Sequence, residues 1–464
     1  MAVCFGVERL DWRGWSWLVV SVALFMALAA CQAKPTQVES SPIDERPDVV
    51  EPLEIEPPVV IVDENALPPE ELTPYGVAAP GVKRIALLLP LTGPHADLGQ
   101  AMADAAALAL FDINSPDLEL IVRDTAGTAM GAETAARDVV AANPDLIVGP
   151  LFATDVEAVS RVARQAGINM ISLSSDRRAA INGAYIMGLD PFQQVDRVVS
   201  YAAEQGYTRF ATLAPGGSFG SQMVQALRDS ALAHGVEVVG VSFYDPASQD
   251  LADVVRGFTS YDGRRAALNA QIAELQAQND EVSRAAIERL KTMEIAGTLD
   301  FDALFLPESG AELRTLAGYL SFYGVDPGSV RILGLSSWED PTLLTEPGLA
   351  GAWFATTPSD RREWFFARFE ETYGEEAPRL ATLTYDAVAL AAALMRNGVS
   401  GDFSDAALTD WRGFGGVEGL FRFKTNGVPE RGLAVVEIER GGFKIVSPAP
   451  TSFPGPVVSW LELK

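Results

Sequence analysis

Side chains that could carry out bond-making chemistry are few in this chain of 464 residues. It has two histidines, His95 and His234, and two cysteines, Cys4 and Cys31. Zinc sites are built from several Cys, His or carboxylate ligands, and no cysteine follows Cys31. Neither a P-loop nor a G-x-G-x-x-G dinucleotide fingerprint is present. The residue count leaves room for a Ser-His-Asp triad, but we expect a protein that binds rather than catalyses, without metal or cofactor.

The charge of the chain is strongly negative. It carries 62 Asp and Glu against 35 Lys and Arg, which gives a net charge of −27. Contacts to nucleic acid phosphates need clustered Lys and Arg side chains, and the sequence shows no such cluster. We therefore expect no nucleic acid partner, and we interpret the acidity as support for solubility.

The N-terminal 30 residues have the pattern of an export signal. Trp15 to Ala30 is a run of 16 residues without a charge. A membrane-spanning helix needs about 20 apolar residues, so this run is short for a span and suits the apolar core of a signal peptide. The run ends in Leu28-Ala29-Ala30-Cys31, which resembles the lipobox of bacterial lipoproteins.

That resemblance implies a lipoprotein signal peptide at 1–30 and a lipidated Cys31, so that the protein meets the membrane through a lipid anchor. Several acyl chains anchor a protein stably where one chain would be marginal. The alternative is an ordinary signal peptide or anchor helix with an incidental cysteine. Residue 32 is Gln rather than Asp. By resemblance to lipoprotein sorting in Gram-negative bacteria, Gln32 favours the outer membrane, with the protein facing the periplasm.

Residues 31–82 differ in composition from the rest of the chain. They hold ten prolines and eleven Asp or Glu, against the two basic residues Lys34 and Arg46. Proline removes a backbone donor, and like charges keep a segment extended. We predict a disordered tether, which serves either as a spacer between membrane and domain or as passive low-complexity sequence.

Beyond Val82, short apolar runs alternate with stretches of helical spacing. The first series predicts strands at 83–90, 118–123, 145–148 and 169–172, and helices at 99–111, 132–142 and 154–167. The second predicts strands at 210–214, 236–244, 301–306 and 330–335, and helices at 220–234, 251–259 and 312–323. Apolar strands alternating with helices are typical of parallel sheets covered on both faces. We expect a two-lobed α/β protein.

Two further stretches have alternative interpretations. The charged amphipathic segment 264–293 predicts a helix or helical hairpin, either a solvated excursion from the second lobe or an arm that docks a partner. The aromatic residues of 353–366 predict either core packing or a protein-contact surface; they are Trp353, Phe354, Trp364, Phe365 and Phe366.

The order of these elements resembles the type I periplasmic-binding-protein fold of the leucine-binding kind. The segments that carry the resemblance include IALLLPLTGPHADLGQ, LIVGPLFATDVEAVSRVARQAGINMISLSS and GVDPGSVRILGLSSWED, and together they cover about 83–448. The lipobox, tether and domain together resemble the penicillin-binding-protein activator lipoproteins. The resemblance implies lobes joined by three hinge crossovers. Lobe 1 is expected at 83–190 plus 345–427, lobe 2 at 191–344 plus 428–448, and a C-terminal tail at 449–464.

In open parallel α/β sheets, ligands bind beyond the carboxyl ends of the strands. The residues expected at those ends, and so in a cleft between the lobes, are Thr92, Gly93, Gly149, Pro150, Thr154, Ser172, Ser174, Ser175, Phe219, Glu308, Ser336 and Glu339. The same residues could instead be helix caps and turns of any α/β protein. The family resemblance implies an activator or interaction partner of a peptidoglycan synthase. The alternative is a receptor that delivers amino acids or related small molecules to an ABC transporter.

Labelling with radioactive palmitate tests the lipid prediction. We expect the full-length protein to incorporate the label in cells, the Cys31→Ala variant to lose it, and the control variant Cys4→Ala to keep it. An unlabelled wild-type protein, or label that survives Cys31→Ala, would contradict the lipoprotein interpretation.

Overall fold

The computed structural model describes residues 81–455, apart from 182, 249, 279, 359 and 397–401. The expected signal peptide at 1–30, the lipid site Cys31, nearly all of the 31–82 tether and the end of the C-terminal tail lie outside the described residues. Within the described ranges, we find no helix with both the length and the apolar character that a membrane span requires.

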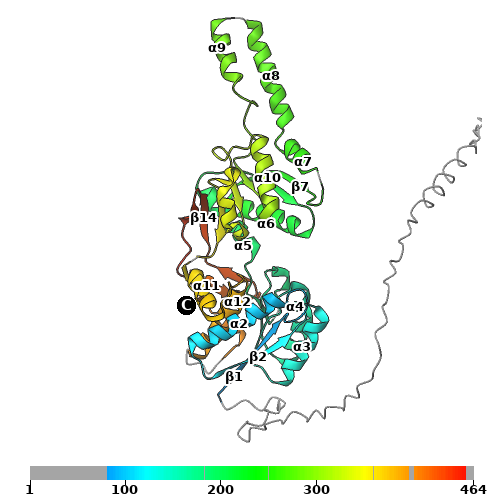
Figure 1. Cartoon of the computed structure of the whole chain (residues 1–464), viewed down its shortest axis with the longest axis vertical. Helices are drawn as coiled ribbons and strands as arrows, with labels where there is room; N and C mark the ends of the chain where they lie inside the picture. Colours follow the sequence, from blue (N-terminus) through cyan, green and yellow to red (C-terminus); the bar gives the residue numbers. More distant parts are fainter. Residues whose placement is uncertain are drawn as a thin grey trace, which may run out of the picture. The chain divides into compact units, whose positions relative to one another are not determined.

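The first lobe is built on a five-stranded parallel sheet (Figure 1). Ile85 to Leu89 are fully buried, as expected for a strand that is covered on both faces. The strand order is β2-β1-β3-β4-β5, with β1 at Lys83–Leu89, β2 at Leu118–Asp124, β3 at Leu146–Val148, β4 at Met170–Ser172 and β5 at Ala184–Ile186.

Helices cover both faces of this sheet, because alternate residues of a strand point to opposite sides. Leu87 belongs to a core with α2, α11 and α12, whereas Leu88 belongs to a core with α3 and α4. The helices are α2 at Ala96–Ile113, α3 at Ala129–Ala141, α4 at Ala153–Ala166, α11 at Asp360–Tyr373, α12 at Ala381–Arg396 and the short α13 at Asp405–Leu408.

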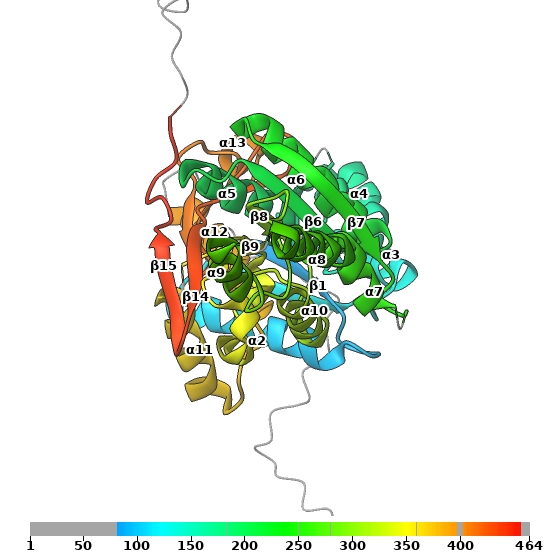
Figure 2. The same ribbon diagram turned by 90° about the horizontal axis from the view of Figure 1, so that it is seen from above.

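The second lobe is built on a seven-stranded mixed sheet of order β15-β14-β10-β9-β8-β6-β7, and Figure 2 shows β15 and β7 toward its two sides. One core contains residues of α7 and α10, and another contains residues of α5 and α6. The strands are β6 at Arg209–Pro215, β7 at Glu237–Tyr244, β8 at Ala303–Phe305, β9 at Arg331–Gly334, β10 at Trp353–Thr356, β14 at Ala434–Glu439 and β15 at Gly442–Ser447. The helices are α5 at Pro191–Glu204, α6 at Ser218–His234, α7 at Leu251–Phe258 and α10 at Gly310–Phe322. The predicted two-lobed α/β architecture is confirmed.

The chain passes between the two sheets three times: after β5, after β10 and before β14. The expected lobe boundary at 345 is wrong, because β10 pairs with β9 and β14 in the second sheet. Phe354 is fully buried in the core of that lobe, whereas Phe365 is buried in the first. The expected aromatic cluster is therefore divided between two cores, and Trp364 is half exposed.

The boundary expected at 428 is also displaced. A small antiparallel sheet, β11-β12-β13, packs against the first lobe through Phe421 and Phe423. Its last strand ends at residue 431, so 428–431 belong to lobe 1 rather than to lobe 2. The bounds are β11 at Phe414–Gly416, β12 at Gly419–Phe423 and β13 at Pro429–Arg431.

The segment 264–293 forms a helical hairpin of α8 (Tyr261–Gln278) and α9 (Glu281–Leu290), which extends away from the second sheet (Figure 1). Leu268 and Ile287 are buried in it. The hairpin therefore buries part of its own apolar face and presents mostly charged, amide and alanine side chains outward, together with Val282, which is 79% exposed.

Four charged side chains meet where the chain passes from β10 to α11. The carboxylate of Glu418 lies 3.3 Å from Arg362 and 3.4 Å from Arg379, and Glu339 lies 3.0 Å from Arg379 and also pairs with Arg362. Glu339 follows β9 of the second lobe, whereas the other three residues belong to the first. We call these four residues the interlobe ion cluster.

The centre of the cluster is removed from water. The side chains of Glu418 and Arg362 are 1% and 4% exposed. Burial alone would raise the pKa of Glu418, but Arg379, Arg362 and the Thr357 hydroxyl outweigh it and hold that pKa at about 2. Glu418 therefore stays ionised when the protein folds.

The loop that carries Glu418 is held by a second buried carboxylate. Asp386 accepts hydrogen bonds from the backbone N–H groups of Val417 at 2.6 Å and Glu418 at 3.1 Å. Burial raises the pKa of Asp386 to about 6, against the lowering effect of the Val417 amide and Arg431. Asp386 thus fixes the position of the cluster's central carboxylate.

Replacing Glu418 with Gln leaves the buried Arg362 guanidinium and the part-buried Arg379 guanidinium to share the single carboxylate of Glu339. We expect Glu418→Gln to lower the free energy of unfolding at pH 7 by about 3 kcal/mol, as for other broken buried ion pairs. Because the folded-state pKa of Glu418 is depressed, its contribution is present above pH 4.5 and is lost as the pH falls toward about 2. The difference between wild type and variant should shrink over that pH range.

Denaturant unfolding followed by circular dichroism at several pH values measures this difference. Glu133→Gln, at an exposed pair with Arg137, is the control and should change stability little. If Glu418→Gln and wild type have the same free energy of unfolding at pH 7, the cluster does not stabilise the contact between the lobes.

Candidate binding site between the lobes

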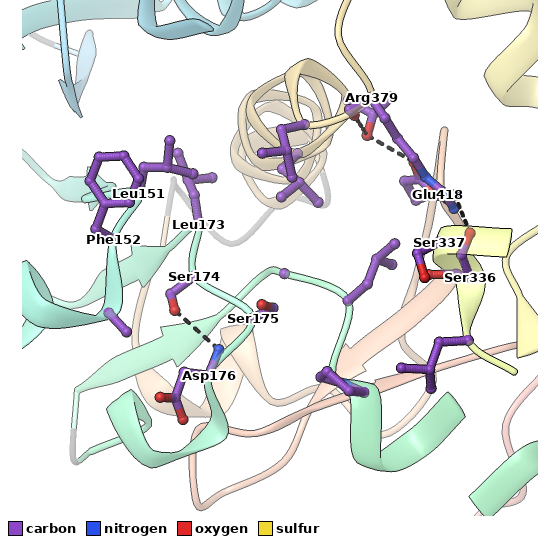
Figure 3. Close-up of a pocket in the computed structure, with 18 of the residues that line it drawn as sticks. Leu151, Phe152, Leu173, Ser174, Ser175, Asp176, Ser336, Ser337, Arg379 and Glu418 are labelled. Carbon is purple, nitrogen blue, oxygen red and sulfur yellow. Dashed lines mark hydrogen bonds and ion pairs between the residues drawn. The ribbon is translucent and has the colours of Figure 1, made fainter. Parts of the chain in front are cut away.

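A cavity of about 670 Å³ lies between the two lobes (Figure 3). This volume falls within the range of about 300–1,000 Å³ that is typical of small-molecule sites. Most of the lining is apolar and comes from lobe 1, including Leu151, Phe152, Leu173, Leu380 and Leu383. Lobe 2 closes the other side with Phe219, Leu335, Ser336 and Ser337.

The cavity is bordered by the starts of several helices; α4, α5, α6 and α10 each follow a strand whose carboxyl end faces the cleft, whereas α12 follows α11. Lining residues lie at or beside the first residues of five helices, which are α4, α5, α6, α10 and α12. The N–H groups of a helix's first turn have no partner within the helix, and that end of the helix carries partial positive charge. In α5 one of them, the Phe192 N–H, already donates to Asp190 at 3.0 Å. The arrangement favours a ligand with hydrogen-bond acceptors attached to an apolar body.

Four of the predicted site residues line the cavity: Ser174, Ser175, Phe219 and Ser336. The Ser174 hydroxyl accepts a hydrogen bond from the Asp176 N–H at 3.1 Å. The Ser336 N–H donates to Gln194 at 2.8 Å, so that a side chain of α5 fixes the start of the lobe 2 wall. In Figure 3, Ser174 and Ser175 lie apart from Ser336 and Ser337 around the cavity.

The other predicted residues of lobe 1 lie outside the lining and have structural contacts. Thr92 donates to Asp124 at 2.6 Å in the loop after β1, next to Gly93. The buried Ser172 hydroxyl donates to the Pro150 carbonyl at 3.2 Å, and Thr154 donates to Asp155 at 2.9 Å. A side chain at Gly149 would collide with the Leu88 carbonyl, 2.2 Å from its Cβ position.

Both predicted acidic residues have partners inside the protein. Glu308 accepts hydrogen bonds from the Tyr244 hydroxyl and, at 3.1 Å, from the Ser309 N–H. Glu339 belongs to the interlobe ion cluster. Neither carboxylate lines the cavity, so neither is placed to hold a ligand amine.

Sequence reasoning missed Arg379 and Glu418, the charged pair that forms part of the cavity wall. Arg379 lies just before α12, 40 residues from Glu339 and 39 from Glu418 in the chain. No local pattern marks it, because its partners come together only in the folded protein. Its guanidinium is shared between two carboxylates, so this wall of the cavity is nearly neutral.

Sequence reasoning also overlooked a pentapeptide with the G-x-S-x-G spacing at Gly216–Gly220, which starts directly after β6 and runs into the first turn of α6. In nucleophile elbows the serine of this pattern works with a histidine. Within the described residues, no hydrogen bond joins Ser218 to either histidine. His234 instead contacts Asp196 at 2.9 Å, and His95 lies against the Phe152 ring. The geometry therefore gives no support for a serine nucleophile.

The sequence is similar to activators of penicillin-binding proteins. It is 24% identical over 365 residues to the penicillin-binding protein activator LpoA of Vibrio antiquarius, which covers 76% of this chain and 56% of that protein. It is 24% identical over 327 residues to LpoA of Aliivibrio fischeri, covering 67% of this chain and 51% of that one. The chain thus spans about half the length of the curated relatives it matches.

Residues 83–262 match the family model described as periplasmic binding protein. A putative branched-chain amino acid ABC transporter protein from Rhodospirillum rubrum superposes with a TM-score of 0.63 at 20% identity, covering 79% of this chain and all of that one. An ABC transporter substrate-binding protein from Sphaerobacter thermophilus gives 0.58 at 18% identity, covering 80% of this chain and 98% of that one. The chain therefore has the fold of the type I periplasmic binding proteins, and over most of its length its sequence is similar to penicillin-binding protein activators.

Proposed function

We propose that this protein is an outer-membrane lipoprotein that faces the periplasm and activates a penicillin-binding protein, acting on a peptidoglycan synthase as a binding partner rather than as an enzyme. The observation that carries the proposal is the similarity to two activators over 365 and 327 residues. That length spans both lobes, so the similarity extends beyond a single shared motif.

The N-terminal sequence fits this role. A lipid on Cys31 would fix the protein to the membrane, and Gln32 favours the outer membrane. The spacer at 31–82 would hold the domain away from the lipid surface. A fully extended segment of this length reaches on the order of 150 Å, at about 3.1 Å per residue.

The cavity between the lobes supports a second candidate function, a receptor for a small solute. Its volume and apolar lining suit a ligand such as an amino acid or an aromatic acid. Helix N-termini border it, so a carboxylate has N–H donors to meet. Proteins of this fold include ABC transporter binding proteins.

A binding and activity assay tests the activator role. We expect the purified full-length protein to retain a bifunctional synthase in a pull-down and to raise its rate of glycan polymerisation, since activation requires a direct complex. A synthase that neither binds nor responds, in an assay where a known activator works, would reject the proposal.

A thermal-shift screen tests the receptor role. An amino acid or benzoate present at 100 times its Kd should stabilise the protein by about 2.7 kcal/mol. Ser175→Phe, which adds bulk to an exposed position of the cavity lining, should abolish the shift. Ser221→Phe, on the exposed side of α6, should preserve it. A flat screen with the wild-type protein would rule out these ligands and favour the activator role alone.

A further inference from the structure

A second hollow, of about 410 Å³, lies on the first lobe and shares no lining residue with the cavity between the lobes. It is bordered by α11, α12 and the strand β11. Three of its residues, Arg361, Trp364 and Tyr385, are of the types enriched at the energetic centres of protein interfaces. We call it the Trp364 hollow.

The packing of α11 explains why a tryptophan faces outward here. Phe365 and Phe369 lie one turn apart and are buried against the first sheet, 0% and 3% exposed. Trp364 therefore points to a different side of the helix, and half of its surface is exposed. Its ring lies 6.2 Å from the Tyr385 ring at an interplanar angle of 77°.

Two glycines of β11, Gly415 and Gly416, form part of the wall of the hollow with backbone atoms alone. A Cβ at Gly416 would lie 2.4 Å from the Asp386 carboxylate, and a Cβ at Gly415 would lie 3.3 Å from Arg361. The two glycines therefore let β11 pass close to α11 and α12 while leaving the space beside Trp364 open. The Tyr385 hydroxyl donates to Asp112 at 3.3 Å, which fixes the second aromatic ring.

Hydrogen-bond donors in the hollow lack strong partners within the protein. The buried tryptophans Trp338 and Trp353 each donate their indole N–H at 2.7 Å. In the part of the chain that the structure describes, the Trp364 indole N–H has no such acceptor. Arg361 has one hydrogen bond, 3.5 Å long, to the Gly416 carbonyl and no ion pair there. A partner can therefore supply acceptors without displacing existing bonds.

The helix and turn around Trp364 are acidic. Five exposed carboxylates between residues 360 and 376 form no ion pair with any described residue; they are Asp360, Glu363, Glu370, Glu375 and Glu376. Two of the three arginines in this stretch are occupied: Arg362 by the interlobe ion cluster, and Arg368 by Asp112 at 3.2 Å and Glu371 at 3.0 Å. Opposite charge at the rim of an interface speeds association and selects the partner. We call the five carboxylates the acidic rim; Asp360 lines the hollow and Glu363 directly precedes Trp364, and their shared negative charge favours a basic partner.

We propose that the Trp364 hollow is the surface on which the protein docks its synthase, and that the docking face of the partner has an apolar side chain ringed by Lys and Arg. The apolar side chain packs on Trp364, and backbone carbonyls beside it accept from Trp364 and Arg361. The inference rests on the proposed activator function, which supplies the partner.

Two tryptophan variants test the proposal. Trp364 and Trp411 are 50% and 49% exposed on the same lobe, but only Trp364 lines the hollow. Surface plasmon resonance with immobilised synthase and the full-length protein should give a Kd about tenfold or more weaker for Trp364→Ala. Trp411→Ala should bind within about twofold of wild type. Circular dichroism melting should show both variants folded.

A pair of charge variants separates this surface from the helical hairpin. Glu370→Lys with Glu375→Lys should slow association at low salt, because the acidic rim attracts the partner. The matched control, Glu274→Lys with Glu281→Lys, reverses two exposed charges on α8 and α9 and should leave association unchanged.

The outcomes separate the proposed activator function from the proposed docking surface. Wild-type protein that fails to bind the synthase rejects the proposed function, and this docking surface with it. Binding that survives Trp364→Ala unchanged, or association that slows only with the hairpin variants, overturns the docking surface and leaves the activator function standing.

Discussion

Two carboxylates and two guanidinium groups, largely removed from water, hold the lobes together where the chain passes from β10 to α11. Arg362 and Glu418 are almost completely buried, and a buried charge that loses its partner is strongly destabilising. Glu339 brings the second lobe into the same cluster. The angle between the lobes is thus tied to the geometry of four side chains, and the cavity is shaped by the same contacts.

Because of the interlobe ion cluster, the cavity between the lobes differs chemically from the Trp364 hollow. Arg379 lines the cavity between the lobes, but its charge is already shared between Glu339 and Glu418. A ligand in that cavity would meet helix N-termini, serine hydroxyls and apolar side chains. On α11, by contrast, Arg361 and Trp364 have N–H donors, and nearby carboxylates have charges, that no described residue pairs strongly. A surface with exposed aromatic and charged groups suits a protein partner, whereas a neutral apolar cavity suits a small molecule.

Apolar runs predicted the parallel sheets well, because a strand buried on both faces must be apolar along its whole length, as Ile85 to Leu89 are. The same reasoning failed at Trp353–Thr356, a short strand followed closely by the aromatic helix α11. Four of the predicted site residues line the cavity because the carboxyl ends of the strands face it: Ser174, Ser175, Phe219 and Ser336. Arg379 and Glu418 could not be predicted, since their partners come from distant parts of the chain.

Hydrogen–deuterium exchange on the full-length protein, alone and with a bifunctional synthase, tests the central claim most directly, because it reports every surface that the partner covers. The account predicts slower exchange in α11 and around Gly415 to Val417 when the synthase is present, with the cavity strands and the hairpin unchanged. Protection confined to the cavity or to α8 and α9, or no protection anywhere, would contradict it.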